Sequence, residues 1–187
     1  MSKKFIVIFV SGNGTNLQYI IDAIENDALC ARISCVICNN SKAYAIKRAQ
    51  HANIPILVCK NESSIINNLN NYKFDLIILA GYMKILSKMF IDFYKNSNIP
   101  IINLHPALPG QFPGKNAIAQ SFAAYQQGSI SETGAMVHYV TEEIDEGKIV
   151  YYEKVKISKI DTLETLTHKI QTIEKPILLT AIKKILN

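Results

Sequence analysis

The stretch FIVIFVSGNGTNLQ, residues 5–18, joins an apolar run, a glycine turn and the start of a helical pattern. Residues 5–10 are all apolar, as expected of a strand that helices cover on both faces. Gly12 and Gly14 permit a tight turn, and apolar residues then recur at spacings of three and four, which predicts an amphipathic helix. A buried strand that leads through a short turn into a helix is the repeating unit of a parallel α/β sheet.

The same alternation continues beyond this first unit. Further strands are predicted at residues 34–38, 54–59, 75–80 and 99–104. Amphipathic helices are predicted at residues 16–29, 43–52, 62–72, 86–96 and 116–128. Polar and apolar residues alternate more visibly at 133–141 and 148–157, which predicts an antiparallel pair at the edge of the sheet.

These elements predict one α/β domain over residues 1–187. The expected architecture is a Rossmann-like, mostly parallel twisted sheet of about seven strands, with helices on both faces and an antiparallel pair near the C-terminus. Residues 161–187 are expected to form a last helix that Pro176 kinks or divides.

Composition narrows the class of protein. Hydrophobic residues make up 49% of the 187 residues and charged residues 19%, as in folded globular domains. The apolar run at residues 5–10 is too short for a signal peptide or a membrane span, so we expect a cytoplasmic protein with no membrane partner and with free thiols. The formal charge of +5 is spread along the chain without a basic cluster, so nucleic acid binding is not expected.

The turn SGNGTNL, residues 11–17, lies where ligands bind in an open parallel sheet, at the carboxyl end of a strand. Ser11, Thr15 and Asn16 offer side-chain donors and a helix cap beside the two glycines. Exposed amides at the N-terminus of the following helix favour an anion such as phosphate. The segment matches neither the dinucleotide fingerprint nor the ATP phosphate loop, and a plain tight turn with a capped helix remains the alternative.

The stretch NLHPALPG, residues 103–110, ends another predicted strand. Side chains two apart on a strand point to the same side, so Asn103 and His105 can face one ligand. An amide and an imidazolium are both donors, and two convergent donors suit a carbonyl oxygen that becomes an oxyanion. The pair therefore suggests acyl-group chemistry, whereas a satisfied structural histidine is the alternative.

A histidine used in this way needs a carboxylate partner that orients the ring and tunes its pKa. The segment EEIDEG offers Glu142, Glu143, Asp145 and Glu146, and sequence spacing does not choose among them. No serine elbow or placed cysteine supplies a nucleophile, so the nucleophile is expected to belong to a substrate. Cys35 and Cys38 have the spacing of a metal-ligand pair, but on a strand they would point to opposite faces. No other group of residues has the spacing of metal ligands, so no metal is expected.

Five blocks of the sequence together resemble the phosphoribosylglycinamide formyltransferase family: SGNGTNLQ at 11–18, LAGYMKIL at 79–86, NLHPALPGQFPG at 103–114, HYVTEEIDEG at 138–147 and IQTIEKPI at 170–177. The resemblance implies transfer of a formyl group from 10-formyltetrahydrofolate to the amine of glycinamide ribonucleotide, in de novo purine biosynthesis. The products would be formylglycinamide ribonucleotide and tetrahydrofolate. The resemblance also implies that the N-terminal half of the single domain, residues 1–187, binds the ribonucleotide and that the C-terminal half binds folate.

The resemblance also implies the roles of individual residues. In the family mechanism the substrate amine attacks the formyl carbon, Asn103 and protonated His105 stabilise the oxyanion, and Asp145 raises the pKa of His105 and assists proton transfer. The implied ribonucleotide-binding residues are Gly14, Thr15, Asn16, Gln171 and Glu174. The implied folate-binding residues are Met83, Lys84, Ile85, Leu86, Asn103, Thr141, Glu142, Glu143, Ile144 and Asp145.

Some positions differ from the family pattern. The sequence Ala107-Leu108-Pro109-Gly110 replaces the more usual SLLP, and Lys60 is only a candidate for the basic folate contact. Formyltetrahydrofolate hydrolase and methionyl-tRNA formyltransferase share some of these blocks, but each would carry a further domain for which this chain is expected to have no room. A non-catalytic mononucleotide-binding module is a third alternative, and both a monomer and a homodimer remain open.

Overall fold

The computed structural model describes residues 3–187, which divide into two compact units. The first unit extends to Ile102 and the second runs from Asn103 to Ile185. The elements of the first unit, with the strand that crosses the boundary, are β1 (Lys4–Val10), α1 (Thr15–Glu25), β2 (Ala31–Cys38), α2 (Ala45–His51), β3 (Ile56–Val58), α3 (Glu62–Leu69), β4 (Leu76–Leu79), α4 (Lys88–Asn96) and β5 (Ile101–His105). Those of the second are α5 (Ala117–Gln126), β6 (Glu132–Tyr139), β7 (Ile149–Lys156) and α6 (Leu163–Leu186).

The strands form one seven-stranded sheet in the order β3-β2-β1-β4-β5-β6-β7. β1 pairs in parallel with β2 and β4, β2 pairs in parallel with β3, and β6 pairs antiparallel with β7. The predicted Rossmann-like fold with an antiparallel pair near the C-terminus is therefore confirmed. The predicted third strand is shorter than expected, because only Ile56–Val58 pair with β2.

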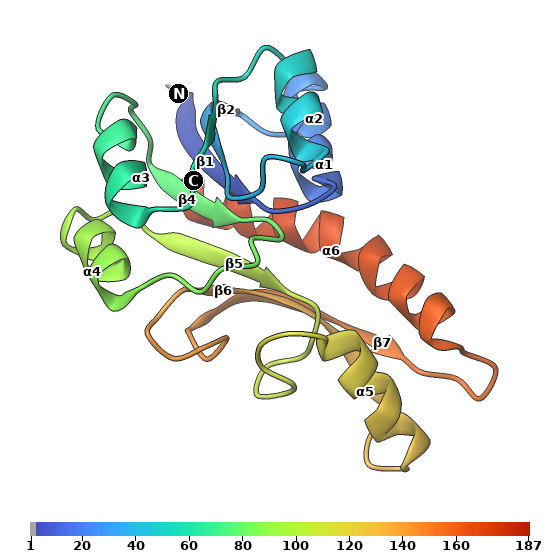
Figure 1. Cartoon of the computed structure of the whole chain (residues 1–187). Coiled ribbons are helices and arrows are strands. Elements are labelled where there is room, and N and C mark those ends of the chain that lie inside the picture. Colours follow the sequence, from blue (N-terminus) through green and yellow to red (C-terminus); the bar gives the residue numbers. More distant parts are fainter. Residues whose placement is uncertain (1–2) are drawn as a thin grey trace. The chain divides into compact units, whose positions relative to one another are not determined.

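The core of the first unit is built around β1. Residues 6–10 are completely buried, as predicted for a strand covered on both faces. In Figure 1, α1 and α2 lie on one side of the strands of this unit, and α3 and α4 lie on the other. The ring of Phe9 packs edge to face against Tyr82 and Phe90, with centroid distances of 5.2 and 5.9 Å, so the strand is anchored to the loop after β4 and to α4.

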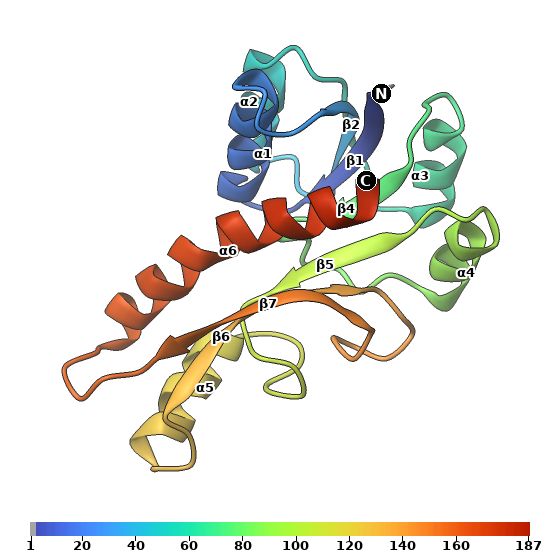
Figure 2. The same cartoon turned by 180° about the vertical axis from the view of Figure 1, so that it is seen from behind.

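The second unit contains the antiparallel pair, with α5 and α6 on opposite sides of it (Figure 2). On one side the hydroxyl of Thr133 in β6 donates to Ser121 in α5 over 3.0 Å, and both residues are buried. On the other side the ammonium of Lys184 in α6 lies 4.6 Å from the ring centroid of Tyr151 in β7. No helix among residues 3–187 combines the length and the apolar character that crossing a bilayer would require.

The last helix, α6, continues through Pro176, so the proline does not divide it, and the other expected effect, a kink, stays a prediction. Proline removes one backbone donor from a helix interior. Here the residues after it, Ile177, Leu178, Ala181 and Ile182, are fully buried, and their packing holds the helix beyond the missing bond. A division of the helix at Pro176 was therefore the wrong prediction.

Gly134 in β6 provides a test of the packing in the second unit. A Cβ at this position would overlap the carbonyl oxygen of Glu153 and lie 2.7 Å from Cδ2 of Leu108. We expect Gly134→Ala to lower the free energy of unfolding by about 1–3 kcal/mol, because overpacking forces the neighbouring strand to shift. Urea denaturation measures this difference. Gly12→Ala is the control, since a Cβ there meets nothing within 4 Å; an equal loss in both variants would contradict the expectation.

Candidate active site

The end of β5 places Asn103 and His105 side by side in the second unit, as the strand period predicts. His105 is buried, with 3% of its surface exposed, and Asn103 is half-buried. Pro106 follows directly and ends the strand, because proline has no backbone donor for the next ladder bond. The two polar side chains therefore sit at a fixed position rather than on a mobile loop.

Asp145 is the carboxylate that the structure selects among the four of the EEIDEG segment. Its Oδ2 lies 3.2 Å from Nδ1 of His105, and its Oδ1 accepts a hydrogen bond from Nδ2 of Asn103 over 3.0 Å. The side chain is only 9% exposed, whereas Glu142, Glu143 and Glu146 are exposed. The implied catalytic trio is thus a contiguous cluster in the second unit.

The backbone of Asp145 adopts a left-handed conformation, with a φ of 58°. This conformation is uncommon for residues other than glycine and costs free energy unless the surroundings hold it. Four donors or rings surround the carboxylate, and their contacts hold the turn in place. The residue with the strained backbone is thus the one whose side chain contacts Asn103 and His105 of β5.

His138 in β6 is a further member of the cluster. Its Nε2 lies 3.3 Å from Oδ1 of Asp145 and 3.2 Å from Nδ2 of Asn103, and its Nδ1 lies 2.9 Å from the carbonyl of Tyr139. The same ring nitrogen of His138 therefore lies within reach of both Asn103 and Asp145. A proton on Nε2 donates to the Asp145 carboxylate, whereas a bare Nε2 accepts from the Asn103 amide.

The loop between β5 and α5 supplies two backbone groups that sequence reasoning missed. The carbonyl of Phe112 lies 3.0 Å from Nε2 of His105, and the amide of Gly114 donates to Oδ2 of Asp145 over 2.8 Å. Phe112 itself has a left-handed φ of 46°. The proline and glycine content predicted an irregular loop, but residue type does not reveal where main-chain groups point.

Burial is the main influence on His105, and it lowers the pKa of the imidazole below its ordinary value of 6.5. The Asp145 carboxylate and the Phe112 carbonyl act in the opposite direction, and the nearby His138 adds to the lowering. Asp145 thus raises the pKa as expected, but it does not outweigh burial. The expected protonated His105 is therefore not the favoured form near neutral pH in the ligand-free protein.

Burial also disfavours the charge on Asp145, but here hydrogen bonds outweigh it. The contacts from His138 and the Gly114 amide, together with the charge interactions with His105 and His138, lower the pKa of the carboxyl below its ordinary value of 3.8. Asp145 is consequently ionised at neutral pH. A neutral imidazole beside an ionised carboxylate can take up a proton when a negative charge appears nearby.

The turn predicted to hold phosphate lies in the first unit. Gly14 is the N-cap of α1 in a left-handed conformation, with a φ of 76°, and no side chain caps the helix. The expected side-chain cap is therefore absent, because the N-cap residue is a glycine. The Ser11 hydroxyl accepts a hydrogen bond from the amide of Met83 over 2.8 Å. The implied ribonucleotide residues Thr15 and Asn16 begin the helix directly after this turn.

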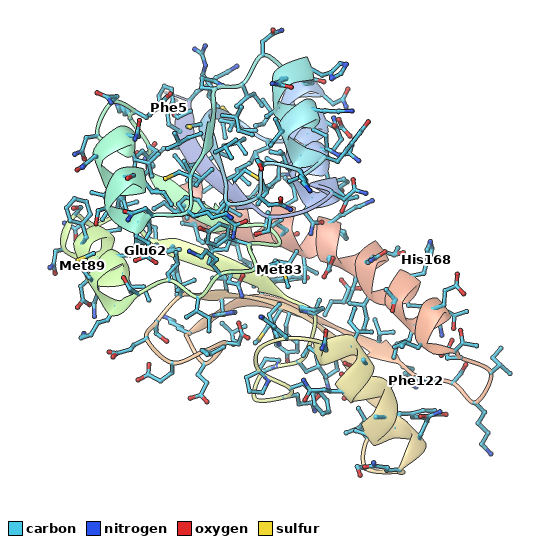
Figure 3. The ribbon with its side chains drawn as sticks, viewed as in Figure 1. Phe5, Glu62, Met83, Met89, Phe122 and His168 are labelled. Carbon is cyan, nitrogen blue, oxygen red and sulfur yellow. The ribbon has the colours of Figure 1, made fainter. Side chains whose placement is uncertain are left out.

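The implied folate-binding residues fall into two groups, one in each unit. Met83, Lys84, Ile85 and Leu86 lie in the loop after β4 in the first unit, where Met83 and Ile85 are 62% and 70% exposed (Figure 3). The Lys84 ammonium donates to the carbonyl of Lys60 over 2.9 Å, so the candidate Lys60 is held by its backbone. Those in the second unit, beside Asp145 itself, are Thr141, Glu142, Glu143 and Ile144.

The remaining implied ribonucleotide residues, Gln171 and Glu174, lie in α6 of the second unit. They are three apart and so share one face of the helix. Gln171 is exposed and Glu174 is half-buried. The structure therefore places them on a common surface, as a pair that binds one ligand requires.

Comparison with known proteins bears on this site directly. Residues 4–182 match the formyl transferase family. The chain belongs to the formyl transferase family. Phosphoribosylglycinamide formyltransferase of Dictyostelium discoideum is 39% identical over 95% of this chain and 96% of its own length. The enzyme of the same name from Schizosaccharomyces pombe is also 39% identical, over 97% of this chain and 96% of its own.

Solved structures of formyl transferases agree with the fold. Glycinamide ribonucleotide transformylase 1 from Geobacillus kaustophilus superposes with a TM-score of 0.89 at 34% identity, covering 99% of this chain and 100% of the other. Phosphoribosylglycinamide formyltransferase from Bacillus halodurans gives the same TM-score at 32% identity, over 98% and 96%. The family and the enzyme class expected from the five sequence blocks are therefore confirmed.

The influence of Asp145 on His105 can be measured directly. Because the carboxylate raises the pKa of the imidazole, Asp145→Asn removes that influence while the amide keeps the size of the side chain. We expect the pKa of His105 in Asp145→Asn to lie below that in the unchanged protein, as followed by NMR titration of the imidazole. Glu143→Gln is the control, since it neutralises an exposed carboxylate of the same loop; a rise in Asp145→Asn would contradict the assignment.

Proposed function

We propose that this formyl transferase moves the formyl group of 10-formyltetrahydrofolate onto the amine of glycinamide ribonucleotide in purine biosynthesis. The observation that carries the proposal is the cluster of Asn103, His105 and Asp145, which unites two potential oxyanion donors with an ionised carboxylate. The names of the relatives support the choice of acceptor, since several full-length matches are phosphoribosylglycinamide formyltransferases. Purine biosynthesis in the cytoplasm is the setting that we propose for this activity.

The reaction joins the acceptor nitrogen to the formyl carbon and then breaks the bond from that carbon to N10 of the folate. The formyl oxygen carries the negative charge of the tetrahedral intermediate. The Asn103 amide and the protonated His105 ring donate to this oxygen and stabilise it. The attacking amine loses its proton to the neutral His105 ring, and this same proton ends on N10 when tetrahydrofolate departs and His105 returns to its neutral form.

The neutral resting state of His105 fits this sequence of events. A buried cation without an oxyanion would be costly, whereas an imidazolium beside a developing oxyanion is favoured by the new charge. Asp145, ionised throughout, stabilises the imidazolium and holds its orientation. Protonation of His105 is thereby tied to the appearance of the charge that it stabilises.

Both ring nitrogens of His105 face acceptors in the ligand-free protein, Asp145 on one side and the Phe112 carbonyl on the other. His105 can therefore donate to an oxyanion only if one of these contacts is released. We propose that the Phe112 contact is released when the substrates bind, because the Asp145 contact is needed to stabilise the imidazolium. The loop between β5 and α5 would then shift between the free and occupied enzyme.

The residues proposed to bind the ribonucleotide are those that the family resemblance implies: Gly14, Thr15 and Asn16 in the first unit, and Gln171 and Glu174 in the second. The N-terminus of α1 has no side-chain cap, so its first amides suit the phosphate of the ribonucleotide. The residues proposed to bind folate are likewise those that the resemblance implies in each unit, and folate acts as a co-substrate without a metal. Glycinamide ribonucleotide and formyl folate are thus the proposed small-molecule partners.

The direct test is an assay of the purified protein with 10-formyltetrahydrofolate and glycinamide ribonucleotide. We expect formation of tetrahydrofolate only when the ribonucleotide is present, because the substrate amine is the proposed nucleophile. A control reaction omits the ribonucleotide. Folate turnover of equal rate in that control would contradict the transferase and would instead indicate a hydrolase that uses water.

The role of His105 gives a sharper expectation. We expect His105→Ala to lower kcat by about 10²–10³-fold, the usual effect of removing one oxyanion donor, while the dissociation constant for the ribonucleotide changes little. His168→Ala is the matched control, because His168 is exposed and projects from α6 (Figure 3). Steady-state kinetics and calorimetry give the two quantities. A kcat for His105→Ala within threefold of the control would overturn the role.

A further inference from the structure

The turn between β1 and α1 is held from behind by α2, through contacts to which no role has been assigned above. We propose that Arg48 in α2 is a positioning residue that fixes this turn so that its backbone amides face the phosphate of the substrate. The proposal deepens the proposed function and rests on it for the identity of that substrate. Every residue that carries the proposal lies in the first unit.

Arg48 contacts the turn through three of its nitrogens. Its Nε donates to the backbone carbonyl of Asn13 over 2.9 Å, and its Nη2 donates to Oδ1 of the same residue over 2.9 Å. Its Nη1 donates to Oε1 of Gln18, in the first turn of α1, over 3.2 Å. A planar guanidinium offers donors in a fixed fork, so these contacts define the orientation of Asn13 and not only its distance.

The start of α2 holds the turn at a second point. The backbone amide of Ala45 donates to the carbonyl of Gly12 over 3.1 Å. A Cβ at Gly14 would lie only 2.7 Å from the Cβ of Ala45, so the turn and the helix touch without room for a side chain. Two successive peptide carbonyls of the turn, those of Gly12 and Asn13, are therefore directed at donors of α2.

The direction of these carbonyls determines the direction of the amides. In a trans peptide the C=O and N–H bonds point in opposite directions, and the described chain contains no cis peptide. The amides of Asn13 and Gly14 consequently point away from α2. Successive amides ahead of a left-handed residue form an anion-binding concavity, which here continues into the uncapped N-terminus of α1.

The competing explanation is that Arg48 favours phosphate binding only through its positive charge. A second cation of α2, Lys47, provides the control for this explanation. Lys47 is the neighbouring cation, and its ammonium lies 5.7 Å from the ring centroid of Tyr44, comparable with 5.0 Å for the Arg48 guanidinium. Among the interactions that the structure describes, only those of Arg48 reach Asn13. Lys47→Ala therefore removes a charge from the same helix without removing a contact to the turn.

The experiment compares Arg48→Ala, Arg48→Lys and Lys47→Ala in the complete chain. We expect Arg48→Ala to raise KM for glycinamide ribonucleotide by about tenfold or more, because the amides must be ordered anew each time phosphate binds. KM for the formyl donor and kcat should remain within about threefold. Arg48→Lys keeps the charge but not the fork, so it should retain most of the defect, and Lys47→Ala should behave as the unchanged protein.

Inorganic phosphate provides a second readout that does not depend on catalysis. We expect phosphate to raise the thermal midpoint of the unchanged protein and of Lys47→Ala, and to raise that of Arg48→Ala much less. Comparison of the midpoints without phosphate shows whether Arg48→Ala is folded, and Arg48→Lys replaces it if it is not.

The outcomes separate this inference from the proposed function. If the unchanged protein does not formylate the ribonucleotide but loses phosphate protection in Arg48→Ala, the function is wrong and the role of Arg48 stands. If it is active and both Arg48 variants keep their KM and their phosphate protection, the role of Arg48 is wrong. Full restoration by Arg48→Lys would reduce the role to charge alone, and no phosphate protection in the unchanged protein would also overturn it.

Discussion

The carboxylate of Asp145 holds together the cluster of polar groups in the second unit. Asp145 is reached by an amide side chain, a backbone amide and two imidazoles, all within 3.3 Å. Burying a charge is costly unless it is paired and hydrogen-bonded, so each of these partners is constrained by the need to satisfy the carboxylate. The position of β5, the bend of the loop after it and the strained backbone of Asp145 itself are linked through this requirement.

The same carboxylate also influences the protonation of His105. Burial favours the uncharged ring of His105, while Asp145 favours the charged one, so the two influences act on the same proton in opposite directions. A further negative charge beside the ring can then change its protonation state. In the proposed mechanism, the site would thus supply positive charge during the reaction without carrying a buried imidazolium before it.

In the first unit, the proposed phosphate site would bind an anion through uncharged backbone groups. α2 fixes the carbonyls of the glycine turn, and the amides are left to face outward. Glycine at position 14 is required twice, by its left-handed φ of 76° and by the closeness of Ala45. Local backbone freedom and tertiary packing therefore act together at this turn.

The sequence by itself determined the α/β class, all seven strands, and the pairing of Asn103 with His105, because these follow from hydrophobic periodicity and from the two-residue period of a strand. The choice of Asp145 among four carboxylates came first from resemblance and then from burial and distance. Tertiary structure alone decided the net pKa direction of His105, the continuity of α6 through Pro176, and the contacts of Phe112, Gly114 and Arg48. Desolvation and main-chain direction depend on segments far apart in the chain, and no local pattern of side chains encodes them.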